Sequence, residues 1–520
     1  MTPGEMLLKE IGTLPELVRA HARARPRHPM VVLDDAVLDA ATLDTQVDRV
    51  AAALQRDGVR AGDTVVLCAD NSIEWIAVFL GALRAGAVVA PLSPSATAET
   101  LARMIDDAEP RVVFVDGPAA ARLASLRERF EARWVTLDGA GEGESEPLDT
   151  WQTPSGIAPQ PVALAPDDPC NLIYTSGTTG TPKGIVQPCS MRWAHVLRGP
   201  LLGYGPDAVT VVALPLYSNT ALVSLLPALG LGGTVVLMRR FDAAGFLSLS
   251  ARYRATHAML VPVLFQRLMA HDDLDRTDLS SYRQKTCTSA PFLPALKAEV
   301  LRRWPGALTE LYGMSEGGAS CMLPVHLHPD KLHTVGRPQP GHEIRLIDDD
   351  GREVPVGEVG EVVGRSPMMM TGYYRLPEQS RAAEWFDGSG RRFIRTGDIG
   401  RLDHDGFLEL LDRKKDVVIS GGANVYPSDL EEVLGAHPAV AEVAVVGVPS
   451  ARWGETPVAF VVLARGAQAA ATELMSWANA RLGKMQRLAA VEVVGALPRS
   501  AIGKVLKRDL RDAYLRRDAG

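Results

Sequence analysis

The feature of this sequence that most limits its fold is a repeated alternation of short apolar strands with helices. Residues 64–90 read as a strand, a helix over 72–85 that Asn71 or Ser72 can cap, and a second strand. This order forms a βαβ unit, which predicts a parallel sheet with helices on its faces. Further strands are expected at residues 112–115, 211–214, 235–237, 258–262 and 285–289.

The length of the chain requires more than one hydrophobic core. At 520 residues it exceeds the size that one core normally serves, so we expect at least two domains. Residues 341–374 read as short strands of a small β-subdomain, and residues 416–520 alternate a helix at 428–435 with strands at 440–446 and 458–462. The predicted fold class is α/β, with a large N-terminal domain of parallel-sheet α/β subdomains, a small β-subdomain and a small α+β C-terminal domain.

Composition and charge exclude several classes of partner. The net charge of −7 argues against a general binder of nucleic acid or of anionic membranes. The five cysteines are scattered without a C-x-x-C pair, which predicts reduced thiols in a cytoplasmic protein. Residues 208–238 carry no charge, but proline, asparagine and glycine interrupt them, so we expect a buried strand, helix and strand and no membrane span. Residues 139–160 are expected to form a surface linker, and residues 1–17 lack the apolar core of a signal peptide.

Residues 174–184 combine hydroxyl, glycine and lysine residues in an order that suits a polyphosphate. The run holds five Ser or Thr residues, three glycines and Lys183. Glycine lets backbone N–H groups approach an anion closely, hydroxyls add donors, and lysine supplies a charge. The run is not a Walker A loop, because Gly184 follows Lys183 where that loop needs Ser or Thr. A flexible Gly/Thr turn would explain the glycines but not the ordered string.

At these residues the chain resembles the adenylate-forming superfamily, which includes acyl-CoA synthetases, peptide-synthetase adenylation domains and beetle luciferase. It is most similar to a bacterial acyl-CoA synthetase. The resemblance covers almost the whole chain, because further motifs of the superfamily follow in order. It implies that residues 174–184 are the phosphate-binding signature and that Thr175 also lies near Mg²⁺. The implied phosphate-binding residues are Thr175, Ser176, Gly177, Thr178, Thr179, Gly180 and Lys183.

A second motif lies at residues 310–316, which read E-L-Y-G-M-S-E. In the superfamily an aromatic-Gly-x-Thr-Glu motif stacks on adenine, contacts the α-phosphate and holds Mg²⁺, which implies these roles for Tyr312, Ser315 and Glu316. Serine replaces the usual threonine and keeps its hydroxyl. A carboxylate suits Mg²⁺, which prefers hard oxygen ligands. The resemblance also implies nucleotide contacts from Ser289, Ala290, Pro291, Glu310, Leu311, Gly313 and Met314.

Two further motifs concern the ribose and the domain boundary. The T-G-D at residues 396–398 resembles a segment whose aspartate, here Asp398, accepts hydrogen bonds from both ribose hydroxyls. The charged run at residues 412–416 resembles the linker between a large and a small domain. It implies that Arg413 also reaches the ribose and that the small domain pivots at Lys415. The implied division is an N-terminal adenylation domain at 1–412, a hinge at 413–415 and a mobile C-terminal domain at 416–520.

The C-terminal residues carry the last motif, P-R-S-A-I-G-K at residues 498–504. The resemblance implies that Lys504 catalyses adenylation, whereas a lysine in a Lys/Arg-rich tail would otherwise indicate a solvated helix. Two glycines after the hinge and a Trp-Gly-Glu segment resemble regions that guide CoA. The implied CoA contacts are Gly421, Gly422 and Trp453.

The acyl pocket is implied only by analogy. Many ligases of the superfamily have a histidine where Ser218 follows Tyr217, so this chain departs from the usual imidazole or aromatic gate. Gly317 and Gly318 are interpreted as leaving room for a bulky acid of medium or long chain, or a cyclic or aromatic one. The pocket residues are expected to be Tyr217, Asn219, Thr220, Val261, Gly317, Gly318 and Met322.

Together these motifs predict an ATP-dependent carboxylic acid–CoA ligase that uses Mg²⁺. The carboxylate would attack the α-phosphorus of ATP to give acyl-AMP and pyrophosphate, with Lys183, Glu316 and Lys504 as catalytic residues. The CoA thiol would then attack the acyl carbonyl. A free-standing enzyme that loads a carrier protein is the alternative. The expected partners are an acid, ATP and CoA, and a homo-oligomer is compatible with the sequence.

Other patterns favour rival interpretations. Residues 313–317 spell G-x-S-x-G, the nucleophile elbow of α/β-hydrolases, with Ser315 as nucleophile. No His-Gly-Gly run precedes it, and that interpretation leaves residues 174–184 unexplained. Residues 321–333 hold one cysteine and three histidines but match no zinc spacing, so we expect a surface loop. A non-catalytic acyl-AMP binder is disfavoured because Glu316 and Lys504 are both present.

Overall fold

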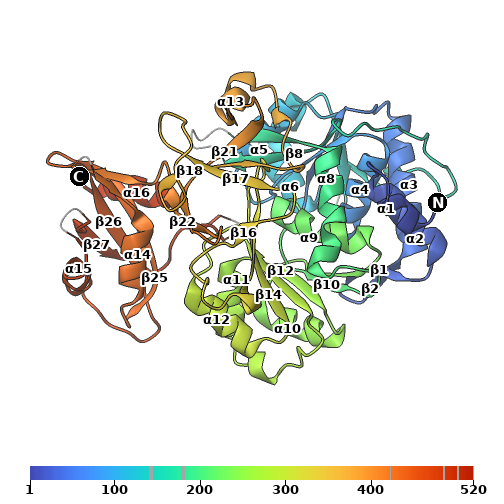
Figure 1. Ribbon diagram of the computed structural model, residues 1–520. Coiled ribbons are helices and arrows are strands. Elements are labelled where there is room, and N and C mark those ends of the chain that lie inside the picture. Colours follow the sequence, from blue (N-terminus) through green and yellow to red (C-terminus); the bar gives the residue numbers. More distant parts are fainter. Residues whose placement is uncertain (140–144, 177–181, 422, 484–485, 501–502, 519–520) are drawn as a thin grey trace. The chain divides into compact units, whose positions relative to one another are not determined.

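The chain forms two compact units, and many of their helices and strands are labelled in Figure 1. This computed structural model describes residues 1–139, 145–176, 182–421, 423–483, 486–500 and 503–518. Unit 1 comprises Met1–Leu332, Pro338–Glu343 and Gly364–Ile394, and unit 2 comprises His333–Arg337, Ile344–Val363 and Arg395–Gly520.

A nine-stranded sheet crosses unit 1 in the order β16-β15-β14-β13-β12-β10-β11-β1-β2. The pairings from β14 through β1 are parallel, whereas β15 and β2 pair antiparallel with their neighbours. This agrees with the predicted parallel sheet. The strands are β1 (Pro29–Leu33), β2 (Ala36–Asp39), β10 (Val209–Val212), β11 (Thr234–Leu237), β12 (His257–Leu260), β13 (Gln284–Thr288), β14 (Ala307–Tyr312), β15 (Cys321–Pro324) and β16 (Arg337–Pro338).

The second sheet of unit 1 has eight strands in the order β19-β9-β8-β4-β3-β5-β6-β7. Its strands β3 and β4 are parallel and flank helix α4 (Ile73–Arg84), which confirms the predicted βαβ unit. The hydroxyl of Ser72 caps α4 by accepting from the Trp75 N–H at 3.0 Å. The strands are β3 (Thr64–Cys68), β4 (Val88–Pro91), β5 (Val112–Val115), β6 (Arg133–Thr136), β7 (Glu146–Pro147), β8 (Pro169–Ser176), β9 (Pro182–Pro188) and β19 (Gly372–Tyr373).

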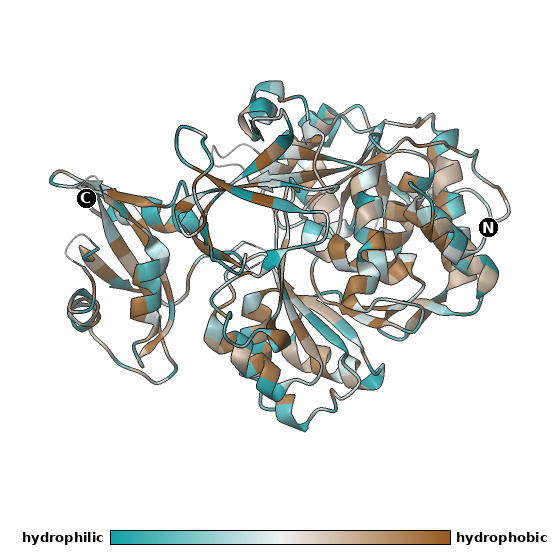
Figure 2. Cartoon of the chain, viewed as in Figure 1, coloured by the Kyte–Doolittle hydropathy of each residue, from teal (hydrophilic) through white to brown (hydrophobic). Residues whose placement is uncertain are grey.

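Helices pack between these two sheets and form much of the core of unit 1 (Figure 1). Helix α2 (Leu14–Ala24) contacts both α4 and α9 (Asn219–Gly230), and α8 (Cys189–Leu197) contacts α9. Residues 75–83 of α4 are all buried, and Figure 2 shows strongly hydrophobic stretches along these helices. The other helices of unit 1 are α1 (Pro3–Leu7), α3 (Ala40–Arg56), α5 (Ala98–Ala108), α6 (Gly117–Leu123), α7 (Leu148–Trp151), α10 (Ala243–Arg252), α11 (Pro262–Met269), α12 (Pro294–Arg303) and α13 (Pro377–Ala382).

A five-stranded sheet has the order β17-β18-β21-β20, with β22 beside β21. It contains the short strands expected after residue 341 but continues well beyond residue 374, so the predicted small β-subdomain was drawn too short. The strands are β17 (Glu343–Ile347), β18 (Val359–Arg365), β20 (Glu384–Phe386), β21 (Arg392–Leu402) and β22 (Leu408–Arg413).

The C-terminal part of unit 2 is a separate α+β layer with its own core. Its sheet has the order β24-β23-β26-β25, with β27 parallel to β26. Residues such as Leu430, Val445, Val461 and Leu474 are fully buried between this sheet and its helices. The predicted fold class is confirmed. The elements are β23 (Val418–Ser420), β24 (Ala423–Val425), β25 (Val440–Ser450), β26 (Gly454–Leu463), β27 (Ala490–Val493), α14 (Pro427–Gly435), α15 (Ala471–Asn479) and α16 (Lys507–Asp518).

The predicted surface linker at residues 139–160 is correct only in part: residues 154–160 are mostly exposed, whereas residues 151–153 are buried. Trp151 is fully buried there, with its ring at 77° to the ring of Phe114 and 5.2 Å between their centres. Its indole N–H donates to Asp57 Oδ2 at 2.7 Å. One tryptophan therefore anchors a segment whose Gly, Glu and Pro content indicated an exposed connection. Among the described residues, no helix has the length and apolar character needed to cross a membrane.

Candidate active site

The described flanks of the predicted phosphate-binding run lie on the antiparallel strands β8 and β9, a pair that is called the hairpin below. The antiparallel register pairs Thr175 with Lys183 and Ser176 with Pro182, so these residues stand at the end of the hairpin. The predicted contacts Gly177, Thr178, Thr179 and Gly180 lie outside the described residues.

Tyr373 joins the hairpin to the second motif. The Lys183 ammonium lies 5.1 Å from the centre of the Tyr373 ring, and the Tyr373 hydroxyl donates to Glu316 Oε1 at 3.0 Å. Burial, together with the Glu316 carboxylate, raises the pKa of Tyr373, so the hydroxyl keeps its proton and acts as the donor. The structure therefore brings Lys183 and Glu316 to one tyrosine. Sequence reasoning missed Tyr373, because a tyrosine in a two-residue strand carries no motif.

The strand that precedes Glu316 is fixed by a buried ion pair. Glu310 on β14 lies 2.5 Å from the ammonium of Lys297 on α12, and both side chains are almost completely buried. Burial raises the pKa of Glu310 to about 7, against the attraction of Lys297. Leu311 is buried as well, whereas Tyr312 and Ser315 are half-buried. The side chains of Glu310 and Leu311 are thus packed in the core and hold the strand that leads into the motif.

The predicted adenine turn adopts an unusual backbone conformation. Ser289 has φ of +79°, in the left-handed region that non-glycine residues rarely occupy. Its hydroxyl forms a 2.7 Å hydrogen bond with the hydroxyl of Thr220, a predicted acyl-pocket residue at the start of α9. This bond connects the candidate nucleotide turn with the candidate acyl pocket. Ala290 and Pro291 follow directly in the same turn.

The serine that replaces the usual histidine has a structural role. Ser218 caps α9 by accepting from the Ala221 N–H at 3.2 Å, and its hydroxyl donates to the Pro215 carbonyl at 2.7 Å. Tyr217 is half-buried, and burial raises its pKa. The residue at position 218 therefore orients the helix that carries Asn219 and Thr220.

The two glycines after Glu316 do not leave room for an acyl group, so that interpretation was wrong. A Cβ on Gly317 would lie 1.8 Å from the Met368 carbonyl oxygen, and one on Gly318 would lie 3.1 Å from the Gly364 carbonyl oxygen. Both glycines have positive φ, and Gly317 forms a bridge with Met369. Close approach of two backbone segments requires them. Of the other expected pocket residues, Val261 is buried and Met322 is half-buried.

In unit 2 the structure brings the predicted ribose residues together with the predicted catalytic lysine. Strands β21 and β22 pair Asp398 with Arg413, whose Nε lies 2.6 Å from Asp398 Oδ1. Loss of hydration and the nearby charges of Arg413 and Lys415 lower the pKa of Lys504, and Asp398 acts in the opposite direction. Four residues from three separate motifs are therefore electrostatic neighbours.

The predicted CoA residues also meet within unit 2. The Gly421 N–H donates to the Trp453 carbonyl oxygen at 2.7 Å, and Gly421 has φ of +57°. Gly422 lies outside the described residues. Next to the predicted pivot Lys415, the ammonium of Lys414 pairs with Asp349 at 2.8 Å and with Glu361 at 3.1 Å.

The two hollows found in unit 1 contain none of the predicted site residues. One is a cavity of about 30 Å³, and the other is a groove of about 680 Å³ near the ends of β3, β5 and β11. Its lining includes six carboxylates, among them Asp70, Asp116 and Asp242, and two arginines, and this excess of negative charge disfavours a polyphosphate.

The rival interpretations gain no support from the described residues. No histidine in the described part of the chain forms a hydrogen bond with Ser315, as a hydrolase triad would require. The described ranges also contain no group of three or more His, Cys, Asp or Glu residues that could hold a metal ion. The five cysteines are free and buried, as predicted.

Comparison with known families agrees with this geometry. The sequence model of the AMP-binding enzyme family matches residues 18–374, and that of the AMP-binding enzyme C-terminal domain matches residues 429–504. The chain belongs to the AMP-binding enzyme family. Its match to the first model alone spans more than half of the sequence.

Individual relatives of this AMP-binding enzyme cover nearly its whole length. The fatty acid–[acyl-carrier-protein] ligase ScoC of Streptomyces coeruleorubidus is 31% identical, over 97% of both chains. The feruloyl-CoA synthase of an Amycolatopsis species is 34% identical, over 95% of this chain and 97% of the relative. The crystal structure of ATP-bound MatB from Rhodopseudomonas palustris has a TM-score of 0.86 and 31% identity, over 97% and 99% of the two chains.

These matches confirm the predicted family, fold and enzyme class. This AMP-binding enzyme is an adenylate-forming enzyme of the acid–thiol ligase class, with ATP, Mg²⁺ and CoA as predicted. The match to ATP-bound MatB over almost the full length extends this agreement to both units.

Proposed function

We propose that this protein is an ATP-dependent carboxylic acid–CoA ligase. It activates an acid as acyl-AMP and then transfers the acyl group to the thiol of CoA. The observation that carries the proposal is the convergence of Lys183 and Glu316 on Tyr373. A cation from a Gly/Thr hairpin and a carboxylate at one site suit a magnesium-bound polyphosphate.

In the first step a carboxylate oxygen of the acid attacks the α-phosphorus of ATP, and the bond from that phosphorus to pyrophosphate breaks. Lys183, the hydroxyl of Thr175 and residue Ser176 hold the leaving phosphates, and Ser315 contacts the α-phosphate. The adenine lies between Tyr312 and the Ser289 turn. Fixed charges and donors lower the barrier chiefly because they are already oriented.

Glu316 fits the Mg²⁺ that accompanies ATP. Its carboxylate is half-buried and oriented by the Tyr373 hydroxyl, and Mg²⁺ prefers hard oxygen ligands. The Thr175 hydroxyl adds a second oxygen at the end of the hairpin. When bound, Mg²⁺ would neutralise negative charge on the pyrophosphate as that group leaves.

Asp398, Arg413 and Lys504 have the remaining roles in the proposed first step. Asp398 accepts hydrogen bonds from the ribose hydroxyls, Arg413 supports it, and Lys504 neutralises charge on the attacking carboxylate and the bridging oxygen. We further propose that residues 413–415 are the hinge between a domain at 1–412 and a mobile domain at 416–520, with Lys415 as the pivot.

In the second step the sulfur of CoA attacks the acyl carbonyl carbon, the carbon–oxygen bond to AMP breaks, and the thiol proton is released to solvent. The hydrogen-bonded Gly421 and Trp453, together with Gly422, guide the pantetheine arm. A glycine backbone lets that arm pass closely. The free, buried thiols favour a reducing compartment, so we place the enzyme in the cytoplasm.

We propose a bulky acid, aromatic, cyclic or of medium to long chain, as the substrate. A relative named feruloyl-CoA synthase supports an aromatic acid, and one named for a fatty acid supports a long chain. The hydrogen bond between Thr220 and Ser289 supports an acyl pocket next to the nucleotide. Tyr217, Asn219, Val261 and Met322 complete its lining.

A carrier-protein ligase is the second candidate, because ScoC is named for that acceptor. The two functions share the first step and differ only in the thiol that receives the acyl group. Release of AMP from ATP across a panel of aromatic, cyclic and straight-chain acids, with and without CoA, separates them. CoA-dependent turnover establishes the CoA ligase. Pyrophosphate exchange without CoA-dependent turnover points to a carrier protein, and no reaction with any acid overturns both.

A further inference from the structure

Arg192 on α8 is a buried cation that no carboxylate neutralises. Its side chain is almost completely buried, and no Asp or Glu in the described part of the chain forms an ion pair with it. Burial lowers the pKa of Arg192 to about 10, so the guanidinium still carries its charge at neutral pH. Helix α8 begins directly after β9, the second strand of the phosphate hairpin.

Neutral amide oxygens take the place of a carboxylate. Arg192 Nε donates to Asn171 Oδ1 at 2.7 Å, and its Nη1 donates to Asn219 Oδ1 at 3.0 Å. Asn171 is a fully buried residue of β8, and Asn219 opens α9. Hydrogen bonds from an ionised donor are roughly twice as strong as those between neutral groups. The charged Arg192 guanidinium therefore orients the side chains of Asn171 and Asn219, and no carboxylate among the described residues pairs with it.

The network continues to the candidate nucleotide motif through Gln187 on β9. Gln187 Nε2 lies 3.3 Å from Asn219 Oδ1 and donates to the Ser315 carbonyl oxygen at 2.7 Å. Both partners are acceptors, which assigns the nitrogen of the amide to this side. Ser315, the residue before Glu316, is thus connected to Arg192 by three hydrogen bonds that link α8, α9, β9 and the turn after β14.

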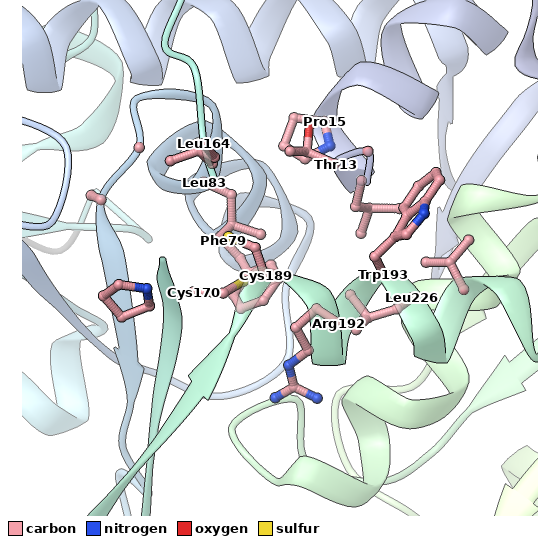
Figure 3. A pocket seen from close by; sticks show the side chains of 16 residues that line it. Thr13, Pro15, Phe79, Leu83, Leu164, Cys170, Cys189, Arg192, Trp193 and Leu226 are labelled. Atoms are coloured by element: carbon pink, nitrogen blue, oxygen red, sulfur yellow. The ribbon is translucent and has the colours of Figure 1, made fainter. Parts of the chain in front are cut away.

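The small cavity beside α8 does not explain the arginine. The stem of Arg192 borders this cavity of about 30 Å³ together with apolar side chains such as Phe79 and Leu83. Figure 3 shows the guanidinium directed away from those side chains. Burying a charge costs several kcal/mol, and an apolar side chain could line the same cavity. Arg192 Nη2 and Gln187 Oε1 are also buried without a hydrogen-bond partner among the described residues. Each unpaired buried atom lowers the free energy of unfolding, so the network is not the most stable arrangement for this part of the core.

We propose that Arg192 is a positioning residue for adenylation. Through Asn219 and Gln187 it fixes the backbone at Ser315, and so the placement of the Ser315 hydroxyl and the Glu316 carboxylate. This inference rests on the proposed function, because the Ser315 hydroxyl and the Glu316 carboxylate act on ATP in the first step. Thioester formation from acyl-AMP needs no new bond at phosphorus and depends on this placement much less.

The test measures each half-reaction in Arg192→Met, Arg192→Lys and Gln187→Leu. Arg192→Met is expected to lower kcat for acid-dependent pyrophosphate exchange by about 10- to 100-fold, with little change in KM for ATP. Thioester formation from supplied acyl-AMP should stay within about 3-fold of the wild type. Arg192→Lys keeps the charge but not the forked geometry, so its loss should be intermediate. Arg267→Met, at an exposed position of α11, is the matched control and should leave both half-reactions unchanged.

A double variant separates positioning from a general loss of structure. If Arg192 acts through Gln187, then Arg192→Met with Gln187→Leu should lose no more adenylation activity than the worse single variant. Additive losses, an equal loss in both half-reactions, or an unchanged kcat in Arg192→Met would overturn the inference. Should Arg192→Met fail to fold, Arg192→Lys and Gln187→Leu carry the same comparison. A wild type that activates no acid would instead overturn the proposed function, and the inference with it.

Discussion

Two buried cations support the same candidate motif, and they are compensated in opposite ways. Lys297 pairs with the carboxylate of Glu310 at 2.5 Å, whereas Arg192 is held by the amide oxygens of Asn171 and Asn219. A buried pair cancels its own charge and is sensitive to the loss of either member. An arginine surrounded by amides keeps its charge, and its charged N–H groups orient the amide side chains through strong hydrogen bonds. The difference predicts that the first region controls stability and that the second controls the rate of adenylation.

Breaking the ion pair should give the largest effect on stability. Lys297→Met removes the attraction that offsets the burial of the Glu310 carboxylate, so above pH 7, where the wild-type carboxylate is ionised, the free energy of unfolding should fall by up to about 3–5 kcal/mol. Chemical denaturation measures this, with Arg302→Met at an exposed position of the same helix as the control. Adding Glu310→Gln to Lys297→Met should restore most of the loss. A double variant as unstable as the single one would show that packing, and not charge, is responsible.

The next test gives Arg192 a carboxylate partner, as Lys297 has in Glu310. Asn171→Asp places a carboxylate 2.7 Å from Arg192 Nε with almost no change in shape. The new buried pair should weaken the charge-assisted bond to Asn219, so adenylation should slow about 3- to 10-fold while the protein stays folded. Pyrophosphate exchange and thermal unfolding measure the two quantities. An adenylation rate equal to that of the wild type would contradict the idea that the uncancelled charge matters.

Tyr373 contacts the same motif through a hydrogen bond to a charged group. Tyr373→Phe removes the 3.0 Å bond to the Glu316 carboxylate, which is expected to be worth about 1.5 kcal/mol, or roughly 10-fold in adenylation. The Mg²⁺ concentration that gives half-maximal activity should rise, because Glu316 loses its orientation. Titration of Mg²⁺ in both proteins checks this. An unchanged Mg²⁺ dependence would separate Tyr373 from the metal.

The smallest predicted effect concerns pH. Burial raises the pKa of Glu310 from 4.5 to about 7, so the folded state binds this proton more tightly than the unfolded state. The stabilisation from that proton is complete below pH 4.5 and is lost as pH rises to about 7. Relative to Glu310→Gln, which does not titrate, the wild type should therefore lose stability over this range. Urea unfolding at several pH values measures the difference, and a constant or rising difference would contradict the assignment.

The sequence predicted those parts of the site that lie within single motifs. The hairpin at 174–184, the run at 310–316 and Lys504 could be located because local residue order carries phosphate and nucleotide chemistry. The βαβ unit at residues 64–90 could be located because its apolar pattern and cap are local. Both kinds of inference depend on residues close together in the chain.

The contacts that were missed join residues far apart in the chain. Tyr373 and Glu316 are 57 positions apart, and Gln187 and Ser315 are 128 apart, so no local pattern reports either bond. Gly317 was misinterpreted for the same reason, because the carbonyl that occupies the space beside it comes from Met368. The sequence shows that glycine is needed there, but only the fold shows whether a ligand or backbone fills the space.

The most direct test of the account is Lys504→Ala, measured separately in the two half-reactions. In the proposed mechanism Lys504 acts in the first step alone, and it lies near Asp398 and Arg413. Pyrophosphate exchange should fall by about 100- to 1000-fold, because one fixed charge at the reacting oxygens is lost. Formation of acyl-CoA from supplied acyl-AMP should be largely preserved, and Arg508→Ala, an exposed residue of α16, should affect neither step. An equal loss in both half-reactions, or none in the first, would contradict the assignment.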